Sequence, residues 1–236
     1  MLHRIPTVVI PAAGRGTRLL SLTRSTPKEL LPVYDSPVLQ FALDEAAAVG
    51  AERVVIVNSP AKATIEAYVN ASLAGGVSLR TDGDGRLQGA AQPKAMLHAM
   101  EIVFMEIVFA FQTAALGLGH AILCARDHML DGCFGVILPD DLILGVQCLP
   151  EMVRKFVSGH MITAMKVPAE KTSSSGMFVP SGDPSLKCVP VSGLVEKPRS
   201  ADAPSRLTAV GRYILDPAIF ETLSNTPLRV PETRYG

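Results

Sequence analysis

The stretch TVVIPAAGRGTRLLSLTRSTPKELLP, residues 7–32, runs from an apolar segment directly into a glycine-rich, basic loop. Residues 8–10 are consecutive and β-branched, which is typical of a strand covered on both faces. Pro11 ends the hydrogen-bond ladder of that strand, because proline has no N–H. Gly14 and Gly16 can each take a positive φ and leave no Cβ between the backbone N–H groups and an anion. The stretch therefore predicts a buried strand followed by a phosphate-binding turn.

This turn differs from the two commonest phosphate-binding fingerprints. No Lys-Ser or Lys-Thr follows at Walker spacing, and Leu19 stands where the dinucleotide pattern has its third glycine. These differences argue against a P-loop NTPase and against a dinucleotide-dependent dehydrogenase. Arg18 and Lys28 add a fixed and a movable positive charge. Taken alone, the glycines leave open a tight strand-to-loop connection that binds nothing.

The composition excludes several classes of protein. The chain has 22 basic and 22 acidic residues and a formal net charge of zero, so no overall field attracts nucleic acid or an anionic membrane. Its four cysteines show no CxxC spacing, which predicts reduced thiols. Four histidines lack Cys or Glu partners at ligand spacing, which argues against zinc: His3, His98, His128 and His160. His120 follows the second glycine turn and is expected to pack at the start of a helix. No signal-peptide plan and no apolar span of about 20 residues is present, so we expect a soluble, cytoplasmic protein.

Apolar strands alternate with helical segments in the first third of the chain. A helix is expected over residues 38–49, a buried strand over 53–57, and a second helix that has Ser59 as its N-cap and Pro60 at its first position. Gly50 is placed to end the first helix. The alternation predicts an α/β fold in which helices flank a parallel sheet.

The later segments continue this pattern, and we expect one domain over residues 1–236. Residues 74–95 are rich in Gly, Asp and Gln and predict a surface insertion or loop. Residues 169–186 are expected to be irregular. The remaining predicted elements are strands at 134–138, 160–167, 194–198 and 209–215 and helices at 121–129, 149–157 and 217–223.

The pentapeptide MEIVF occurs twice in succession, at residues 100–104 and 105–109. The repeat has an odd number of residues, and side chains of a strand alternate between its two faces. The second copy therefore reverses the alternation of the first, so one copy must bulge out or turn its apolar side chains to the wrong face. We interpret this as a local duplication and expect local strain.

Charged residues lie at the carboxyl ends of two of the predicted strands. Asp140 and Asp141 follow the strand at 134–138, where α/β sheets bind their ligands. The residues alone leave a metal site and a solvated turn as equal alternatives. Glu196 and Lys197 are adjacent, so they can face one pocket only if a bulge or bend interrupts their strand.

Six segments together resemble the sugar-nucleotide pyrophosphorylases, and most closely the bacterial UTP:glucose-1-phosphate uridylyltransferases. The resemblance runs from Ile5 to about Pro227 and is poorest at residues 74–109. It implies a Rossmann-like nucleotidyltransferase fold with a mostly parallel central sheet flanked by helices. The segments, in their order along the chain, are GRGTR at 14–18, PKELLP at 27–32, LGLGHAILCARD at 116–127, GVILPDD at 135–141, GLVEKP at 193–198 and AVGRYIL at 209–215.

The resemblance implies that the glycine turn holds UTP. Ala13 and Gly14 would contact the nucleoside through their backbones. Gly16, Thr17 and Arg18 would hold the triphosphate.

Further nucleotide and metal contacts are implied by the same family. Lys28 would neutralise the departing pyrophosphate, and Glu29 would lie near the nucleotide. Gln112 and Gly117 would read the uracil edge. Asp140 would bind Mg²⁺, whereas the motif does not fix Asp141, which we interpret as a bystander.

The family also implies a sugar side and a reaction. Glu196 would hydrogen-bond the hydroxyls of glucose 1-phosphate, Lys197 would clamp its phosphate, and Gly176 would face the sugar. The sugar phosphate would attack the α-phosphorus of UTP in line, and Mg²⁺ with Arg18, Lys28 and Lys197 would stabilise the developing charge. Assembly into a homo-oligomer is compatible with the family.

The sequence also departs from the family pattern. After Pro227 the segment LRVPETRYG lacks the acidic motif that the family shows there, and a truncation or frameshift is the simplest interpretation. Leu116 replaces a usual lysine, and Ser174-Ser175 replaces a usual Ala-Tyr. Three hypotheses follow: an active uridylyltransferase, a catalytically impaired nucleotide-binding fragment, or a relative that uses dTTP or another sugar 1-phosphate.

Overall fold

The computed structural model describes residues 4–14, 16, 23, 25–72, 94–98 and 101–227, without the side chains of residues 72, 94–98 and 101–104. The chain forms two compact units. Unit 1 comprises residues 1–161 and 212–236, and unit 2 comprises residues 162–211. Strands β8 (Met161–Lys166) and β11 (Leu207–Leu215) each contain a point where the chain passes from one unit to the other. The single domain predicted over residues 1–236 stays a prediction.

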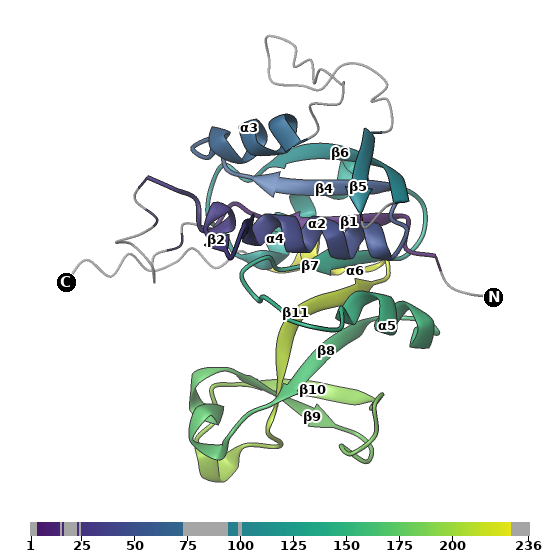
Figure 1. Cartoon of the computed structure of the whole chain (residues 1–236). Coiled ribbons are helices and arrows are strands. Elements are labelled where there is room, and N and C mark those ends of the chain that lie inside the picture. Colours follow the sequence, from purple (N-terminus) through teal and green to yellow (C-terminus); the bar gives the residue numbers. More distant parts are fainter. Residues whose placement is uncertain are drawn as a thin grey trace. The chain divides into compact units, whose positions relative to one another are not determined.

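Unit 1 is built on a mostly parallel sheet (Figure 1). Strands β7, β1, β4 and β6 lie side by side in that order and are parallel. Antiparallel strands flank them, since β5 pairs with β6 and residues 212–215 of β11 pair with β7. The predicted α/β class is therefore confirmed. The bounds are β1 (Thr7–Pro11), β4 (Arg53–Asn58), β5 (Lys94–His98), β6 (Glu101–Phe111) and β7 (Phe134–Ile137).

Alternate residues of the central strands enter two different cores. Val8 and Ile10 of β1 belong to one core, whereas Val9 belongs to the other, and all three are fully buried. The first core also contains residues of α2 (Val38–Ala48), α3 (Ala63–Ser72) and α5 (Cys148–Lys155). The second contains residues of α4 (Leu118–Cys124) and α6 (Ile219–Asn225). Helices thus cover both faces of the sheet, as the unbroken β-branched runs predict.

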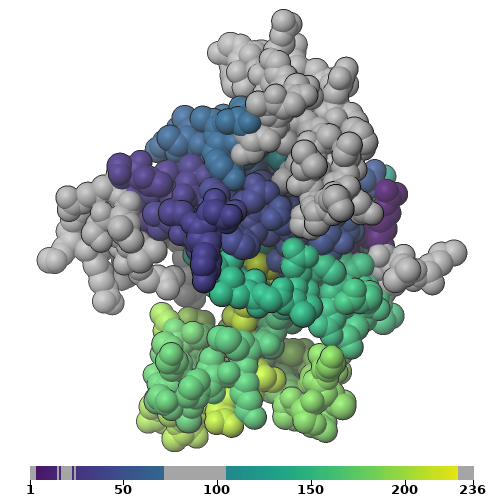
Figure 2. Space-filling model, in the orientation of Figure 1, coloured from purple at the N-terminus to yellow at the C-terminus, as the bar shows by residue number. Residues whose placement is uncertain are grey.

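In Figure 2, purple and blue atoms, the colours of α2 and α3 in Figure 1, lie side by side on the surface of unit 1. On the other face of the sheet, the rings of Phe134 and Phe220 stack with their centroids 5.2 Å apart. Short elements complete the unit: β2 (Pro32–Val33), β3 (Ser36–Pro37) and the 3₁₀ helices Lys28–Leu30 and Arg126–His128. None of the helices among the described residues is long and apolar enough to cross a bilayer.

The start of α3 differs from the prediction. Ser59 does not cap a helix, because the backbone N–H of Lys62 donates to the Ser59 carbonyl at 2.9 Å and closes a turn before the helix begins at Ala63. Asn58 stabilises this turn, since its Oδ1 accepts from the Ser59 N–H at 2.8 Å. Residues 59–62 are consequently a loop at the carboxyl end of β4.

Residues 101–109 of the two pentapeptides lie within one continuous strand, β6. Residues 101–105 pair with β5 and residues 106–111 pair with β4, and neither pairing has a register shift. Of the two predicted alternatives, a bulge or an apolar set turned to the wrong face, the bulge is therefore wrong for residues 101–111. Met105, Ile107 and Phe109 enter the first core, and Val108, which points to the other face, is 8% exposed, so the second copy is covered on both faces. A strand buried on both faces accepts apolar residues in either alternation. The insertion predicted at 74–95 lies outside the described residues, except where β5 begins.

Unit 2 contains a small antiparallel sheet. Its strands β9 (Gly176–Pro180) and β10 (Val191–Glu196) pair with each other, and β9 also pairs with β11. Residues 169–186 are thus only partly irregular, because the sequence analysis missed β9. Met177 and Phe178 of that strand are buried and hold it in place. The unit also has the 3₁₀ helices Ala169–Ser174 and Ser200–Asp202.

Candidate functional site

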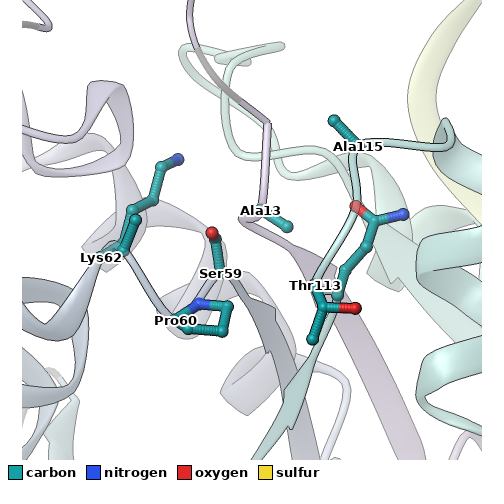
Figure 3. A pocket seen from close by; sticks show the side chains of 8 residues that line it. Ala13, Ser59, Pro60, Lys62, Thr113 and Ala115 are labelled. Atoms are coloured by element: carbon teal, nitrogen blue, oxygen red, sulfur yellow. The ribbon is translucent and has the colours of Figure 1, made fainter. Parts of the chain in front are cut away.

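A pocket of about 390 Å³ lies where β1, β4 and β6 end. These three strands are parallel, so their carboxyl ends meet at one edge of the sheet, where open α/β sheets bind ligands. The volume is within the range of small-molecule sites. In Figure 3, Ser59, Pro60 and Lys62 lie across from Thr113 and Ala115, with Ala13 between them. The complete lining is Ala13, Ser59, Pro60, Ala61, Lys62, Gln112, Thr113 and Ala115.

The glycine turn follows β1 at one side of this pocket. Gly16 has a φ of 63°, as predicted for a residue in a tight turn. Gly14 does not have a positive φ, so that part of the prediction is wrong. A Cβ on Gly14 would lie 3.6 Å from Lys28 Nζ, which shows that the turn and the second motif are adjacent. Thr17 and Arg18, predicted to hold the triphosphate, lie outside the described residues.

Lys62 joins the glycine turn to the Pro-Lys-Glu-Leu segment. Its Nζ donates to the carbonyl oxygens of Ala12 at 2.7 Å and Gly14 at 2.6 Å. It also donates to the Glu29 carboxylate, at 2.9 and 3.1 Å from the two oxygens. The ammonium thus has an acceptor for each of its three hydrogens. These contacts hold two carbonyls of the turn toward Lys62.

Glu29 is buried, with a side chain that is 0% exposed. Burial raises the pKa of its carboxyl group above the ordinary value, and the bond and charge of Lys62 oppose that rise. Lys28 contributes less, since its Nζ is 4.0 Å from Glu29 Oε1. The role predicted for Glu29, near the nucleotide, stays a prediction. Its observed contacts are those of an anchor for Lys62.

Lys28 and Asp140 form an ion pair beside the glycine turn. Lys28 Nζ lies 2.6 Å from Asp140 Oδ2, although 112 residues separate the two in sequence. The Lys28 side chain is 17% exposed, whereas that of Asp140 is 49% exposed. The structure therefore brings together Gly14, Lys28 and Asp140, which the sequence analysis selected from three separate motifs.

A buried ion pair supports the turn that carries Asp140. Arg212 Nε lies 2.7 Å from Glu45 Oε2, and both side chains are 3% exposed. Arg212 Nη1 donates to the carbonyls of Leu138 and Asp141 on either side of Asp140. The other oxygen of Glu45 accepts from the Leu149 N–H at 2.8 Å. One pair of charges thus connects α2, β11, the start of α5 and the turn after β7.

Gln112 is buried in the pocket wall, and its predicted role as a base reader stays a prediction. Its backbone N–H donates to the Asn58 carbonyl at 2.8 Å. Its side-chain Nε2 donates to the Gly117 carbonyl at 3.1 Å, so the two predicted base readers contact each other. Gly117 has a φ of 92°, a conformation that strongly favours glycine.

In unit 2, Gly176 pairs with Glu196 across β9 and β10. A Cβ on Gly176 would lie 3.0 Å from Glu196 Oε2 and 2.7 Å from Leu194 Cδ2. Lys197 follows directly and has a φ of 47°, so the regular strand ends at Glu196. Its Nζ lies 3.9 Å from Glu196 Oε1. The bend that both side chains need in order to face one site is therefore present.

Sequence reasoning missed three charged residues that organise unit 1: Lys62, Glu45 and Arg212. The last two were detectable, because each interrupts an apolar run: Glu45 lies among alanines and leucines, and Arg212 lies within AVGRYIL. Lys62 gave no comparable signal in the sequence. The pocket residues after β4 and β6 could also have been found from the sequence. They follow the carboxyl ends of predicted strands, which is the criterion that selected Asp140.

Asp140 fits a site for a divalent ion. Mg²⁺ is usually bound through one or two carboxylates, with substrate phosphates and waters completing its shell. Asp140 is half-exposed and lies beside the glycine turn, so its carboxylate can reach an ion on a phosphate. No group of three or more acidic, His or Cys side chains gathers among the described residues.

Comparisons with known proteins agree with this geometry. A family model described as nucleotidyl transferase matches residues 7–234, so the match continues past Pro227. The chain is 32% identical over 227 residues to a UTP–glucose-1-phosphate uridylyltransferase of Komagataeibacter xylinus, covering 95% of this chain and 78% of that protein. It is 34% identical over 236 residues to the protein of that name from Escherichia coli, covering 95% and 75%.

Solved structures give the same result. A UDP-glucose pyrophosphorylase complexed with UDP-glucose is similar with a TM-score of 0.72 and 28% identity, covering 94% of this chain and 80% of that one. A UTP-bound UGPase from Acinetobacter baumannii is similar with a TM-score of 0.75 and 28% identity, covering 94% and 78%.

Proposed function

The chain belongs to the nucleotidyl transferase family, and from this premise we propose that it transfers a uridylyl group from UTP to glucose 1-phosphate. The products would be UDP-glucose and pyrophosphate. The observation that carries the proposal is the arrangement in unit 1, where the pocket, the glycine turn and the Lys28–Asp140 pair adjoin one another. A base in the pocket would extend its phosphates toward these charges.

The reaction requires little covalent help from the protein. A phosphate oxygen of glucose 1-phosphate is already an anionic nucleophile, so no general base is needed. It forms a bond to the α-phosphorus of UTP while the bond to pyrophosphate breaks on the opposite side. Catalysis then depends on orientation and on stabilisation of the developing negative charge.

Lys28 is the described residue best placed to stabilise the leaving pyrophosphate, because its ammonium lies beside the glycine turn. The same role is proposed for Arg18, outside the described residues. Mg²⁺, when bound at Asp140, would add positive charge on the phosphates. Lys28 would then be released from Asp140 toward the triphosphate. The carbonyl oxygens of Ala12 and Gly14 accept hydrogen bonds from Lys62. They therefore do not point toward the triphosphate, which they would repel.

The sugar side is assigned to unit 2. Glu196 would accept hydrogen bonds from glucose hydroxyls, and Lys197 would contact the sugar phosphate. The support is local: Gly176 lies directly opposite Glu196 in the sheet, and the bend at Lys197 brings its Nζ to 3.9 Å from Glu196 Oε1, so that both charges lie on one side. We also propose a cytoplasmic location, since all four cysteines are free thiols.

The test is a pyrophosphate-release assay with the purified chain, UTP, glucose 1-phosphate and Mg²⁺. We expect release that requires both substrates, with dTTP and galactose 1-phosphate as poorer alternatives. Absence of release with every pair would overturn the proposal. Calorimetric titration with UTP then identifies the catalytically impaired nucleotide-binding alternative, which predicts binding without turnover.

A further inference from the structure

The Gln112 amide has both of its hydrogens engaged away from the pocket. Nε2 lies 3.1 Å from the Gly117 carbonyl oxygen and 2.9 Å from His120 Nδ1. A carbonyl oxygen can only accept, so the amide atom that faces it must be the nitrogen. Neither Gly117 nor His120 lines the pocket, whereas Gln112 does.

The remaining polar atom of this amide is Oε1. Among the described residues, none donates a hydrogen bond to it. Gln112 is only 5% exposed, and a buried polar atom normally has a partner. The side chain therefore presents to the pocket an acceptor and no donor.

His120 holds this orientation of the Gln112 amide from outside the pocket lining. Because Nε2 of Gln112 donates its second hydrogen to Nδ1, the ring must be neutral and carry its proton on its own Nε2. Cys124 Sγ lies 3.7 Å from the same Nδ1, and burial raises the pKa of this thiol, which keeps it a weak donor. The amide of Gln112, at 2.9 Å, is therefore the nearer donor to the single lone pair of Nδ1.

We propose that His120 is a positioning residue that keeps the Gln112 oxygen toward the base and thereby makes the pocket select a pyrimidine with an N3–H donor. The inference deepens, and rests on, the proposed function. Uracil has a hydrogen on N3, whereas cytosine has a bare acceptor there. An acceptor facing an acceptor leaves both without a partner, which a buried site does not tolerate. CTP should therefore bind more weakly than UTP.

Two variants of His120 with the same branched shape test the proposal. His120→Asn places a side-chain oxygen near the position of Nδ1, so it keeps the acceptor. His120→Leu has the same outline without an acceptor. Calorimetry gives the Kd for UTP and for CTP with each full-length chain, and the quantity of interest is the ratio Kd(CTP)/Kd(UTP). Gln112→Leu, alone and combined with His120→Leu, completes the set.

The wild-type ratio should exceed about tenfold, and His120→Asn should keep it within about twofold. His120→Leu should lower the ratio about fivefold, the effect of one neutral hydrogen bond. In the Gln112→Leu background, His120→Leu should not change the ratio further. A merely structural role would instead raise both Kd values by one factor, and that result would overturn the proposal.

The two proposals can fail separately. Wild-type protein that prefers UTP, together with an unchanged ratio in His120→Leu, overturns only the role of His120. Wild-type protein that binds neither nucleotide overturns the proposed function, and this inference with it.

Discussion

Two lysines of unit 1 have the same side-chain chemistry and opposite surroundings. Lys62 is bound to two carbonyls and a buried carboxylate, so all of its hydrogens stay within the protein. Lys28 contacts the half-exposed carboxylate of Asp140, and a metal ion that binds this carboxylate can displace the Lys28 ammonium. We infer that Lys62 shapes the turn and that Lys28 meets the substrate.

Replacing Lys62 by methionine should lower the free energy of unfolding by about 3 kcal/mol near pH 8, because Glu29 would stay buried without its cation. Burial already raises the pKa of Glu29, and removing Lys62 removes the main opposing cause. A carboxyl whose pKa is higher in the folded than in the unfolded state loses stability as pH rises through that interval. The loss should therefore be smaller at pH 5 than at pH 8.

Urea unfolding of the wild type and Lys62→Met at both pH values measures this difference. The matched control is Lys62→Met with Glu29→Gln, which should remove the pH dependence of the loss. An equal loss at both pH values would show that the ion pair is not its origin.

Asp140→Asn should lower kcat well over tenfold, since an amide is a much weaker ligand for a divalent ion than a carboxylate. The variant should also need more Mg²⁺ for half-maximal rate. Asp141→Asn is the neighbouring control, and its rate should stay within about twofold of wild type because its side chain has no proposed role. An unchanged rate in Asp140→Asn would refute the metal assignment.

At the scale of elements, the site is formed by several loops at one edge of the sheet and not by a single sequence motif. The loops after β1, β4 and β6 line the pocket, and the turn after β7 carries Asp140. The Arg212–Glu45 pair connects that turn to α2 and α5. Its members are 167 residues apart, so the pair also joins distant parts of the chain.

Arg212→Met should destabilise the protein by about 3–5 kcal/mol, because it leaves Glu45 charged and buried. The carbonyls of Leu138 and Asp141 would lose their donor as well, so kcat should fall with the displaced Asp140. Urea unfolding and the release assay measure both effects.

The double variant Glu45→Met with Arg212→Met removes both charges and should recover part of the lost stability, since only backbone groups stay unpaired. A double variant less stable than Arg212→Met would contradict a coupling between these charges.

At the scale of the molecule, the two units have different roles in the proposed reaction. The base pocket, Lys28 and Asp140 belong to unit 1, whereas Gly176, Glu196 and Lys197 belong to unit 2. Glu196→Gln should consequently raise KM for glucose 1-phosphate about fivefold, through loss of a charged acceptor, and leave the Kd for UTP unchanged.

Steady-state kinetics and calorimetry separate these two quantities. Glu170→Gln, an exposed glutamate of the same unit, is the control and should change neither. Weaker binding of UTP in Glu196→Gln would argue against the division of roles.

Local pattern was sufficient for much of the fold. The β-branched runs at Val8–Ile10 and Val54–Val57 predict buried strands because that property depends on neighbouring residues alone. The same holds for Gly50 at the end of α2, which has a φ of 69°. The start of α3 was missed because Asn58, a residue of the preceding strand, stabilises a turn there. Strand β9 was missed because its burial depends on pairing with distant strands.

The candidate site divides in the same way. Gly14, Lys28 and Asp140 were selected from the sequence, since a basic glycine turn and a strand-end carboxylate are local features, whereas Gln112 was selected through the family resemblance. Which groups meet was decided only by the packing of the sheet, because parallel strands bring together loops that are far apart in the chain. The three acceptors of Lys62 and the Glu45–Arg212 pair arise from that packing, whereas the contact of Gln112 with His120, eight residues apart, depends on the course of the loop between β6 and α4.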